Sequence, residues 1–190
     1  VLILCFLSLI ILLQFNFFTI FLGIASMVLA FSYPFMKRIT YWPQLFLGLT
    51  FNWGIIMSWT SVTNSVGIEP IILYIAAIFW TLGYDTIYGF QDIKDDEIIG
   101  VKSTSIKFKN NPKKILILCY TITIISLITI GKLMNSNFIY FSLMVIPFMH
   151  LFYFQIYRLK ANDPLNCLKI FKSNNSFGLI VLIIIILSKI

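Results

Sequence analysis

Charged residues are scarce in this chain of 190 residues. Asp, Glu, Lys and Arg make up 11% of it, whereas soluble proteins carry about one quarter. Hydrophobic residues account for 59%, so too few polar groups remain to cover a water-soluble surface. The composition therefore excludes a soluble globular domain and predicts an integral membrane protein.

Cysteine and histidine are also rare. Cys5, Cys119 and Cys167 show no CxxC spacing, which argues against a disulfide framework or a zinc site, and we interpret them as small buried apolar residues. His150 is the single histidine, with no second histidine, cysteine or acid near it in the sequence. An ionisable group within a membrane span suggests function, but one histidine is a poor metal site, so we expect a neutral, hydrogen-bonded structural residue.

Long apolar runs fill most of the chain. A bilayer core requires about 20 apolar residues per helix, and lipid offers the backbone no hydrogen bonds, which favours helices. One amide, Asn52, falls at mid-membrane depth, and we expect it to bond within its own helix or to a neighbouring one. The sequence predicts an all-α, multi-helix transmembrane bundle with seven spans, at residues 1–13, 17–33, 45–62, 68–83, 115–131, 138–157 and 177–190.

Basic residues outnumber acidic ones by 14 to 7, and their positions predict the orientation. In a bundle of seven spans, loops 34–44, 84–114 and 158–176 share one face and hold 12 of the 14 basic residues, whereas Lys132 and Lys189 fall on the other. Lys and Arg concentrate in cytoplasmic loops. We therefore expect these loops on the cytoplasmic side of a bacterial inner membrane, or on the matrix side of the mitochondrial inner membrane, and no nucleic-acid partner.

An acidic stretch at residues 84–103 interrupts the apolar sequence. Five of the seven acids lie between Asp85 and Glu97. At about 100° per residue, Asp85, Asp92 and Asp96 would share one face of a continuous helix, within roughly 40°. Carboxylates so placed repel one another unless a cation lies between them. The DxxxD spacing suits a Mg²⁺ ion that also binds a diphosphate, and the alternative is a solvated acidic loop.

A second polar stretch, YPFMKRITYWPQ, occupies residues 33–44. If the helix continues through Pro34, Tyr33 and Lys37 lie one turn apart on the same face. Lys37 and Arg38 then have two interpretations. They form an ordinary basic anchor at the membrane surface, or Lys37 supplies a charge and Tyr33 a hydroxyl donor to an oxyanion.

Together, YDTIYGFQDIKDDEIIGVKST and YPFMKRITYWPQLFLGLTFNWG resemble the UbiA superfamily of intramembrane prenyltransferases. The likeness is strongest to the branch that acts on 4-hydroxybenzoate in ubiquinone biosynthesis, and it extends to FKSNN at 171–175. Members have nine transmembrane helices and two aspartate-rich motifs that hold Mg²⁺ and the diphosphate of a polyprenyl donor. The resemblance implies a single transmembrane prenyltransferase domain over residues 1–190, equivalent to helices three to nine. Two helices and a first motif, NDxxDxxxD, are then expected upstream of Val1.

The resemblance also implies roles for the polar residues. Metal and base would neutralise the leaving diphosphate, the allylic C–O bond would ionise, and the prenyl cation would alkylate the ring carbon ortho to the phenol. Arg38, beside Lys37, is the candidate anchor for the benzoate carboxylate, because a guanidinium pairs with carboxylate bidentately. The implied sets are the metal ligands Asp85, Asp92 and Asp96, the diphosphate-binding residues Tyr33, Lys37 and Lys102, and the catalytic residues Asp92, Asp96 and Lys37.

The sequence leaves three alternatives to this function. Within the enzyme class, the acceptor is another quinone or haem precursor. A cation transporter would also gather acids at a membrane surface, but transporters usually carry ionisable groups at mid-bilayer depth, and here the acids lie beyond a helix end. A catalytically inactive membrane protein is the third alternative, if the full gene lacks the first aspartate motif.

Overall fold

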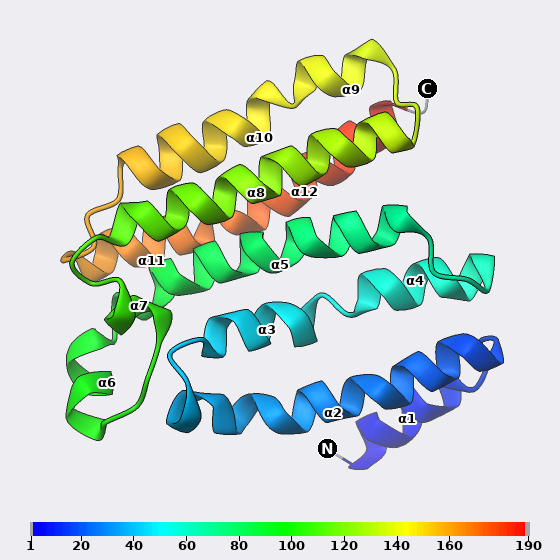
Figure 1. Cartoon of the computed structure of the whole chain (residues 1–190), viewed down its shortest axis with the longest axis horizontal. Helices are drawn as coiled ribbons and strands as arrows, with labels where there is room; N and C mark the ends of the chain where they lie inside the picture. Colours follow the sequence, from blue (N-terminus) through cyan, green and yellow to red (C-terminus); the bar gives the residue numbers. More distant parts are fainter. Residues whose placement is uncertain (1, 189–190) are drawn as a thin grey trace.

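The computed structural model describes residues 2–188, and within them every regular element is helical (Figure 1). The order of these elements follows the predicted spans, although several spans are built from more than one piece. The elements are α1 (Leu2–Leu12), α2 (Phe17–Ile39), α3 (Pro43–Phe51), α4 (Gly54–Thr63), α5 (Ile68–Gly89), α6 (Ile93–Ile99), α7 (Thr104–Lys107), α8 (Pro112–Leu133), α9 (Phe138–Leu143), α10 (Val145–Met149), the π-helix η1 (His150–Tyr157), α11 (Pro164–Lys172) and α12 (Asn174–Leu187).

The prediction of an all-helical membrane bundle is confirmed. Six helical stretches among the described residues are long and apolar enough to cross a membrane, and α1, at the first predicted span, is a shorter apolar helix. The last stretch begins at Pro164, well before the predicted start at 177, because α11 is helical and α12 follows it almost directly. The predicted positions of Val1, Lys189 and Ile190 lie outside the described residues. The six stretches are 17–39, 43–63, 68–89, 112–133, 138–157 and 164–187.

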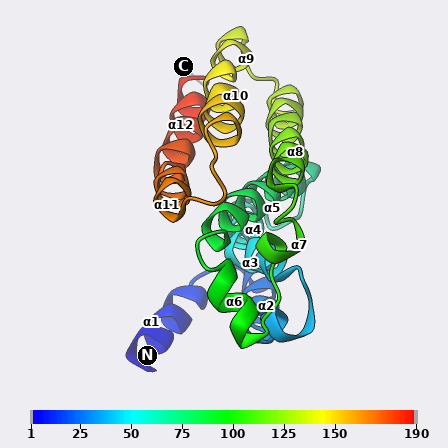
Figure 2. The same ribbon diagram turned by 90° about the vertical axis from the view of Figure 1, so that its left-hand side faces the viewer.

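Helix α5 is the central element, since it contacts α3, α4, α7, α8 and α11. Seen from the end (Figure 2), α8, α9, α10 and α11–α12 pack on one side of α5, while α3–α4, α2 and α1 form a row on the other. The short helices α6 and α7 lie together at one end of the bundle. The chain therefore returns to the same end of the bundle after α2, after α5 and before α11.

The third span breaks between α3 and α4, and its polar residues bond to both neighbouring helices. Asn52 donates through Nδ2 to the Gly48 carbonyl at 2.9 Å and to the Thr81 hydroxyl of α5 at 2.8 Å. Trp53 donates through Nε1 to the Leu22 carbonyl of α2 at 3.0 Å. The expected bond from Asn52 to a neighbouring helix is confirmed.

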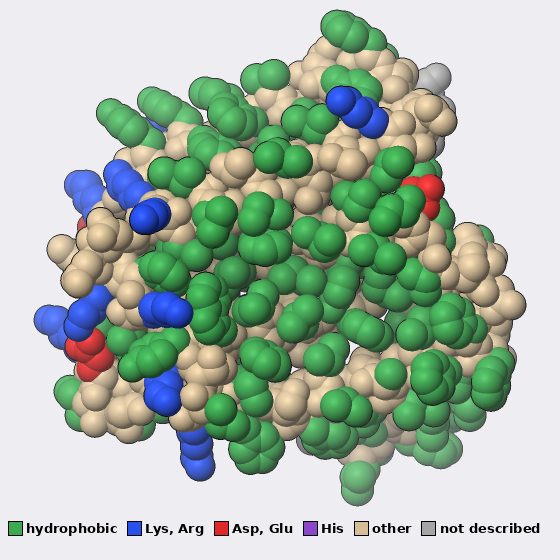
Figure 3. Space-filling model, viewed as in Figure 1, with side chains coloured by type: hydrophobic (Ala, Val, Ile, Leu, Met, Phe, Trp, Pro, Cys, Tyr) green, Lys and Arg blue, Asp and Glu red, His purple; other side chains and the backbone are tan. Residues whose placement is uncertain are grey.

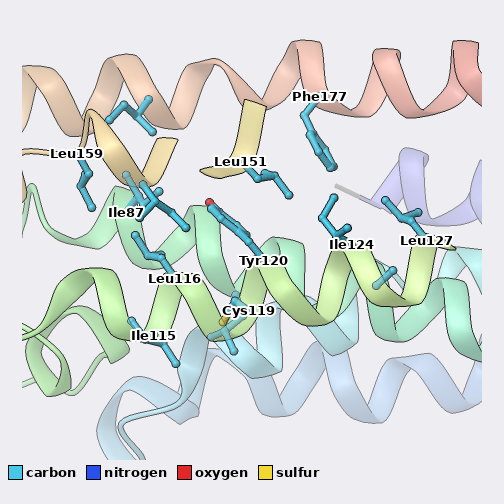
Figure 4. Close-up of a cluster of buried hydrophobic side chains, with 14 of the residues drawn as sticks. Ile87, Ile115, Leu116, Cys119, Tyr120, Ile124, Leu127, Leu151, Leu159 and Phe177 are labelled. Atoms are coloured by element: carbon cyan, nitrogen blue, oxygen red, sulfur yellow. The ribbon is translucent and has the colours of Figure 1, made fainter. Parts of the chain in front are cut away.

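The hydrophobic core lies where α5, α8, η1, α11 and α12 meet (Figure 4). Cys119 and Cys167 are buried in it, as expected, but Cys5 is exposed on α1, so the prediction that all three cysteines are buried is wrong. A half-buried His150 hydrogen-bonds Ser173 over 3.3 Å between Nε2 and Oγ, as predicted for a structural histidine. Outside the core, hydrophobic side chains cover most of the face in Figure 3, as expected for a lipid-facing surface.

Candidate functional site

The acidic stretch does not form one continuous helix. α5 ends at Gly89 and α6 begins at Ile93, so Asp85 belongs to α5 while Asp92 precedes α6 and Asp96 lies in its first turn. The expectation that the three acids share a face of one helix is therefore wrong. They still lie at the same end of the bundle, because α6 begins directly after the turn that ends α5.

Helix α7 explains the break. The Ser105 hydroxyl donates to the Thr86 carbonyl at 2.8 Å. If α5 were longer, this carbonyl would accept from the Phe90 amide. Phe90 instead donates to the Ile87 carbonyl at 3.3 Å. Gly89 lies against Ser105, where a Cβ would overlap the Ser105 hydroxyl. The close approach of α7 thus ends α5 and turns the chain into α6.

On the opposite side of the site, α2 continues through Pro34 to Ile39. The condition for Tyr33 and Lys37 to share a face is therefore met. Lys37 and Arg38 lie in the last turn of α2, where cations interact favourably with the negative end of the helix dipole. Both side chains are exposed, so each remains accessible to an anion at this end of the bundle.

Lys37 is the basic residue that acts on the acids of both α5 and α6. Its ammonium acts electrostatically on the carboxylates of both Asp85 and Asp96, and Asp85 also acts on the hydroxyl of Tyr33. Among the described residues, Lys37 forms no direct ion pair with either acid. Lys37 of α2 is thus within electrostatic range of one carboxylate on α5 and another on α6.

Burial raises the pKa of the Asp96 carboxyl. Lys37 opposes this shift and lowers the pKa, while the negative charges of Asp92 and Asp95 raise it further. Asp96 therefore gives up its proton less readily than an exposed aspartate. A further cation near the start of α6 would favour the charged form.

Asp85, Asp92 and Asp96 do not make a compact set of ligands. Within residues 2–188, no three Asp, Glu, His or Cys side chains gather closely enough to hold a metal ion by themselves. Asp92 and Asp96 are linked by the hydrogen bond from the Asp96 amide to the Asp92 carbonyl, at 2.8 Å, and lie one turn apart. Two carboxylates at this spacing suit an ion that takes its other ligands from phosphate and water.

Lys102 connects the end of the acidic stretch to the end of α2. Its backbone amide donates to the Lys37 carbonyl at 2.7 Å, and its ammonium donates to the Ile39 carbonyl at 3.2 Å. The ammonium also lies 5.6 Å from the centre of the Tyr41 ring. Lys102 therefore holds the loop after α6 next to Lys37, a role that its sequence position did not indicate.

Buried polar residues that the sequence analysis missed fix α7 in place. The Gln44 side chain accepts from the Thr104 amide at 3.0 Å, and the hydroxyls of Thr86 and Thr104 lie 2.6 Å apart. Lys109 forms an ion pair with Glu97 of α6 at the surface. A signal was present in the sequence, since Gln44 begins an otherwise apolar span and Ser103 and Thr104 directly follow the acids.

A group of packed aromatic rings, the aromatic wall, lies on the part of α5 that carries Asp85. It consists of Trp80, Tyr84 and Tyr88 with Phe171 of α11 and Phe177 of α12. Ring centres lie 5.2 Å apart for Trp80 and Tyr84, and 4.8 Å apart for Tyr88 and Phe171. Tyr84 directly precedes Asp85, so the wall lies at the same level along α5 as that acid.

An apolar channel extends from this wall along the bundle. A hollow of about 220 Å³ lies against Trp80 and Phe177. It adjoins a larger one of about 720 Å³, because Ile55, Leu73 and Ile185 line both. The larger hollow reaches Glu69, and the smaller one reaches Trp80, eleven residues later on α5. At 1.5 Å per residue, the two hollows together extend for about 16 Å along the helix. The other end, at Trp80, is five residues before Asp85 on α5, which is about 7.5 Å along the helix axis.

Known proteins resemble this chain over most of its length. The family model described as "UbiA prenyltransferase family" matches residues 1–180. A protein of Bos taurus named "4-hydroxybenzoate polyprenyltransferase, mitochondrial" is 43% identical over 180 residues, which are 93% of this chain and 48% of that protein. A "4-hydroxybenzoate octaprenyltransferase" of Histophilus somni (strain 129Pt) is 40% identical over 97% of this chain and 64% of its own length. The chain thus spans less than two thirds of either relative.

Two solved structures share the fold. The apo structure of a UbiA homologue from Aeropyrum pernix K1 has a TM-score of 0.75 at 19% identity, covering 94% of this chain and 67% of that one. A structure of digeranylgeranylglyceryl phosphate synthase has a TM-score of 0.71, also at 19% identity, covering 98% of this chain and 66% of that one. At this identity the likeness concerns the fold alone.

Proposed function

The chain belongs to the UbiA prenyltransferase family, and we propose that the full-length protein transfers a polyprenyl group from polyprenyl diphosphate to the ring of 4-hydroxybenzoate in ubiquinone biosynthesis. One observation carries this proposal. Lys37 lies within electrostatic range of Asp85 and Asp96, and a hollow with apolar walls begins at Trp80, five residues before Asp85 on α5. A polyprenyl diphosphate has a matching form, since its charged head is joined to a long apolar tail.

We further propose that Asp92 and Asp96 hold Mg²⁺, with Asp85 contributing from α5. Their spacing at the start of α6 fits an ion that takes phosphate oxygens as its remaining ligands. A bound Mg²⁺ would neutralise charge on the diphosphate leaving group and so favour ionisation of the allylic C–O bond. Burial and the charges of Asp92 and Asp95 raise the pKa of Asp96, and a bound cation would favour its charged form.

The protein's own groups perform the rest of the proposed chemistry. Lys37 stabilises the negative charge that develops on the diphosphate, and Tyr33, on the same face of α2, donates a hydroxyl proton to one of its oxygens. Lys102 keeps the loop after α6 close to Lys37 and adds a second positive charge. Tyr84 and Tyr88 of the aromatic wall exclude water from the allylic carbon and present ring faces that tolerate its positive charge.

The distribution of basic residues supports a membrane orientation for this chemistry. Lys and Arg side chains gather mainly at the end of the bundle where α6 and α7 lie (Figure 3). By the positive-inside rule, this end faces the cytoplasm of a bacterial cell or the mitochondrial matrix. Both substrates then meet at that surface, the prenyl donor from the bilayer and the aromatic acid from the water.

The proposal is tested by prenyl transfer in membranes that contain the full-length protein. With Mg²⁺, a long-chain polyprenyl diphosphate and labelled 4-hydroxybenzoate, we expect a labelled lipid product that disappears when the ion is chelated. Other phenolic acceptors, tested alongside, identify a different quinone or haem precursor. Absence of transfer from every diphosphate donor, together with ion flux in liposomes, would instead favour a transporter.

We propose Arg38 as the anchor for the carboxylate of the aromatic acid, because it is exposed beside Lys37 at the end of α2. The Arg38→Ala variant should raise KM for 4-hydroxybenzoate about tenfold or more, the cost of losing a hydrogen bond to a charged group. KM for the prenyl donor, measured in the same steady-state assay, should not change. An unchanged KM for the aromatic acid would remove Arg38 from the site.

Gly178 offers a test of whether the channel holds the prenyl tail. It lines the smaller hollow, and a Cβ there would lie 3.5 Å from the Trp80 ring. Gly178→Leu should therefore narrow the channel and lower kcat/KM for a long-chain donor at least about tenfold relative to farnesyl diphosphate. Gly178→Ala is the matched control, because its methyl group fits at ordinary contact distance. Equal losses for long and short donors would place the tail elsewhere.

A further inference from the structure

A network of four polar side chains crosses the hydrophobic core beneath the proposed active site. Asn174 of α12 accepts two hydrogen bonds at Oδ1, one from Trp80 Nε1 of α5 at 2.8 Å and one from Gln155 Nε2 of η1 at 2.9 Å. Gln155 in turn accepts a hydrogen bond from the Tyr120 hydroxyl of α8. Tyr120 reaches from α8 into the core (Figure 4). The Asn174 network, made of these four residues, therefore links α5, α8, η1 and α12.

Three members of this network are buried polar side chains, which are costly in a membrane bundle unless they are hydrogen-bonded. Tyr120 and Gln155 are fully buried, and Asn174 is 7% exposed. Among the described residues, no buried side-chain nitrogen or oxygen lacks a hydrogen-bond partner. Polar groups at such sites persist where they fix a geometry or take part in function. The proposed chemistry uses none of these polar atoms, so their role remains to be explained.

The position of Asn174 in its own helix fixes its amide. Its Nδ2 donates to the Phe171 carbonyl at 3.0 Å, close to where α11 gives way to α12 at Ser173. That bond orients the amide so that Oδ1 faces the core and accepts from both Trp80 and Gln155. A leucine of similar size would leave both donors without an acceptor.

The network contacts α5 at two residues that precede Asp85, Trp80 and Gly83. Trp80 lies one turn before Tyr84, and the two rings pack edge to face. The Tyr120 ring packs against Gly83 so closely that a Cβ at this position would overlap it. Asp85 follows Trp80 and Gly83 on α5, so contacts that fix the rotation of α5 at these two residues also fix the position of Asp85 relative to Lys37 of α2.

We propose that Asn174 is a positioning residue for the acidic end of α5. Through Trp80 on one side, and through Gln155 and Tyr120 on the other, it fixes the rotation of α5 at which Asp85 faces Lys37. Asn174 itself touches neither substrate nor metal. This inference rests on the proposed function, since the geometry that the network would maintain is that of the proposed active site.

The test compares Asn174→Leu with Asn175→Leu in the full-length protein. Asn175 is the exposed neighbour in the sequence, so it receives the same substitution outside the core. Three quantities are measured in lipid nanodiscs: the unfolding midpoint, the affinity for Mg²⁺ with inorganic pyrophosphate by calorimetry, and kcat and KM for both substrates. Pyrophosphate has no tail, so its affinity reports on the charged site without any contribution from the channel.

We expect Asn174→Leu to weaken Mg²⁺-pyrophosphate binding and to lower kcat, each by about tenfold or more, as misplaced catalytic groups do. KM for the aromatic acid should stay unchanged, and Asn175→Leu should match the wild type. Wild-type affinity and kcat in a folded Asn174→Leu protein would overturn the proposal, because a merely structural role would change the unfolding midpoint alone.

A second variant keeps the proposal testable if Asn174→Leu does not fold. Trp80→Phe keeps an aromatic ring beside Tyr84 but removes the indole donor to Asn174. We expect its pyrophosphate affinity to fall by about threefold or more, and wild-type affinity would overturn the proposal. If the wild-type protein binds Mg²⁺-pyrophosphate but transfers no prenyl group, the proposed function fails, whereas weaker binding by either variant would still support positioning by the network.

Discussion

Replacing Asp96 with asparagine should lower the turnover of the full-length enzyme by at least about 100-fold, the usual effect of removing one group that stabilises charge in a transition state. Asp96 is the acid of α6 on which Lys37 acts, and it lies one turn after Asp92. The asparagine keeps the shape of the side chain but removes its negative charge. Steady-state transfer of labelled 4-hydroxybenzoate to a lipid product measures the effect.

The stability of the Asp96→Asn variant should not fall with its activity. Because the pKa of Asp96 is raised in the folded protein, the folded state binds a proton more tightly than the unfolded state does, and deprotonation costs stability as the pH rises through the pKa. Asparagine removes that cost. An inactive Asp96→Asn protein should therefore unfold at the same temperature as the wild type, or at a slightly higher one.

Asp95→Asn is the matched control for Asp96→Asn. Asp95 is its exposed neighbour on α6, so the same charge is lost from the same helix. This variant should keep turnover within about twofold of the wild type, since exposed charges contribute little. If the two variants lose activity equally, the effect comes from the general charge of α6, and Asp96 is not a specific ligand.

Much of the architecture was predictable because the bilayer imposes simple rules. Apolar runs located the long helices, although the last of them begins at Pro164, before its predicted start, and the basic loops marked one end of the bundle. The shared face of Tyr33 and Lys37 was also predictable, because it depends only on helical spacing and on α2 continuing through Pro34. Local sequence was sufficient wherever one helix alone decided the outcome.

Contacts between helices decided the features that the sequence could not reveal. The break after Gly89 depends on Ser105, sixteen residues later, taking the Thr86 carbonyl. Asn174 and Trp80 meet although 94 positions separate them, and nothing in either local pattern pairs them. Periodicity describes one helix at a time, so it predicted a shared face for three acids that tertiary contacts divide between two helices.

These tertiary contacts also explain why a single cation serves both acids. The turn after Gly89 brings α6 back over the end of the bundle, where Lys102 attaches the following loop to the last turn of α2. Lys37 is thereby brought within electrostatic range of both Asp85 and Asp96. In the proposed reaction its charge would have two separable roles, to compensate Asp85 in the folded protein and to bind the diphosphate.

Replacing Lys37 with methionine should abolish both roles. We expect turnover to fall at least about 100-fold and the unfolding midpoint to drop, because the half-buried Asp85 carboxylate loses the cation that faces it. Leaving such a group without its partner costs about 1–3 kcal/mol. The control is Lys109→Met, which removes a surface ion pair with Glu97 and should cost no more than about 1 kcal/mol, with full activity.

The double variant Lys37→Met/Asp85→Asn separates the two roles. Removing the Asp85 charge should restore the unfolding midpoint that Lys37→Met lowers, since no unpaired carboxylate remains. Turnover should stay at the level of the single Lys37→Met variant, because removing the Asp85 charge does not restore the ammonium that Lys37 presents to the leaving diphosphate. If turnover recovers together with stability, Lys37 serves only to compensate Asp85, and the positive charge at the leaving group must come from Lys102 and the metal ion.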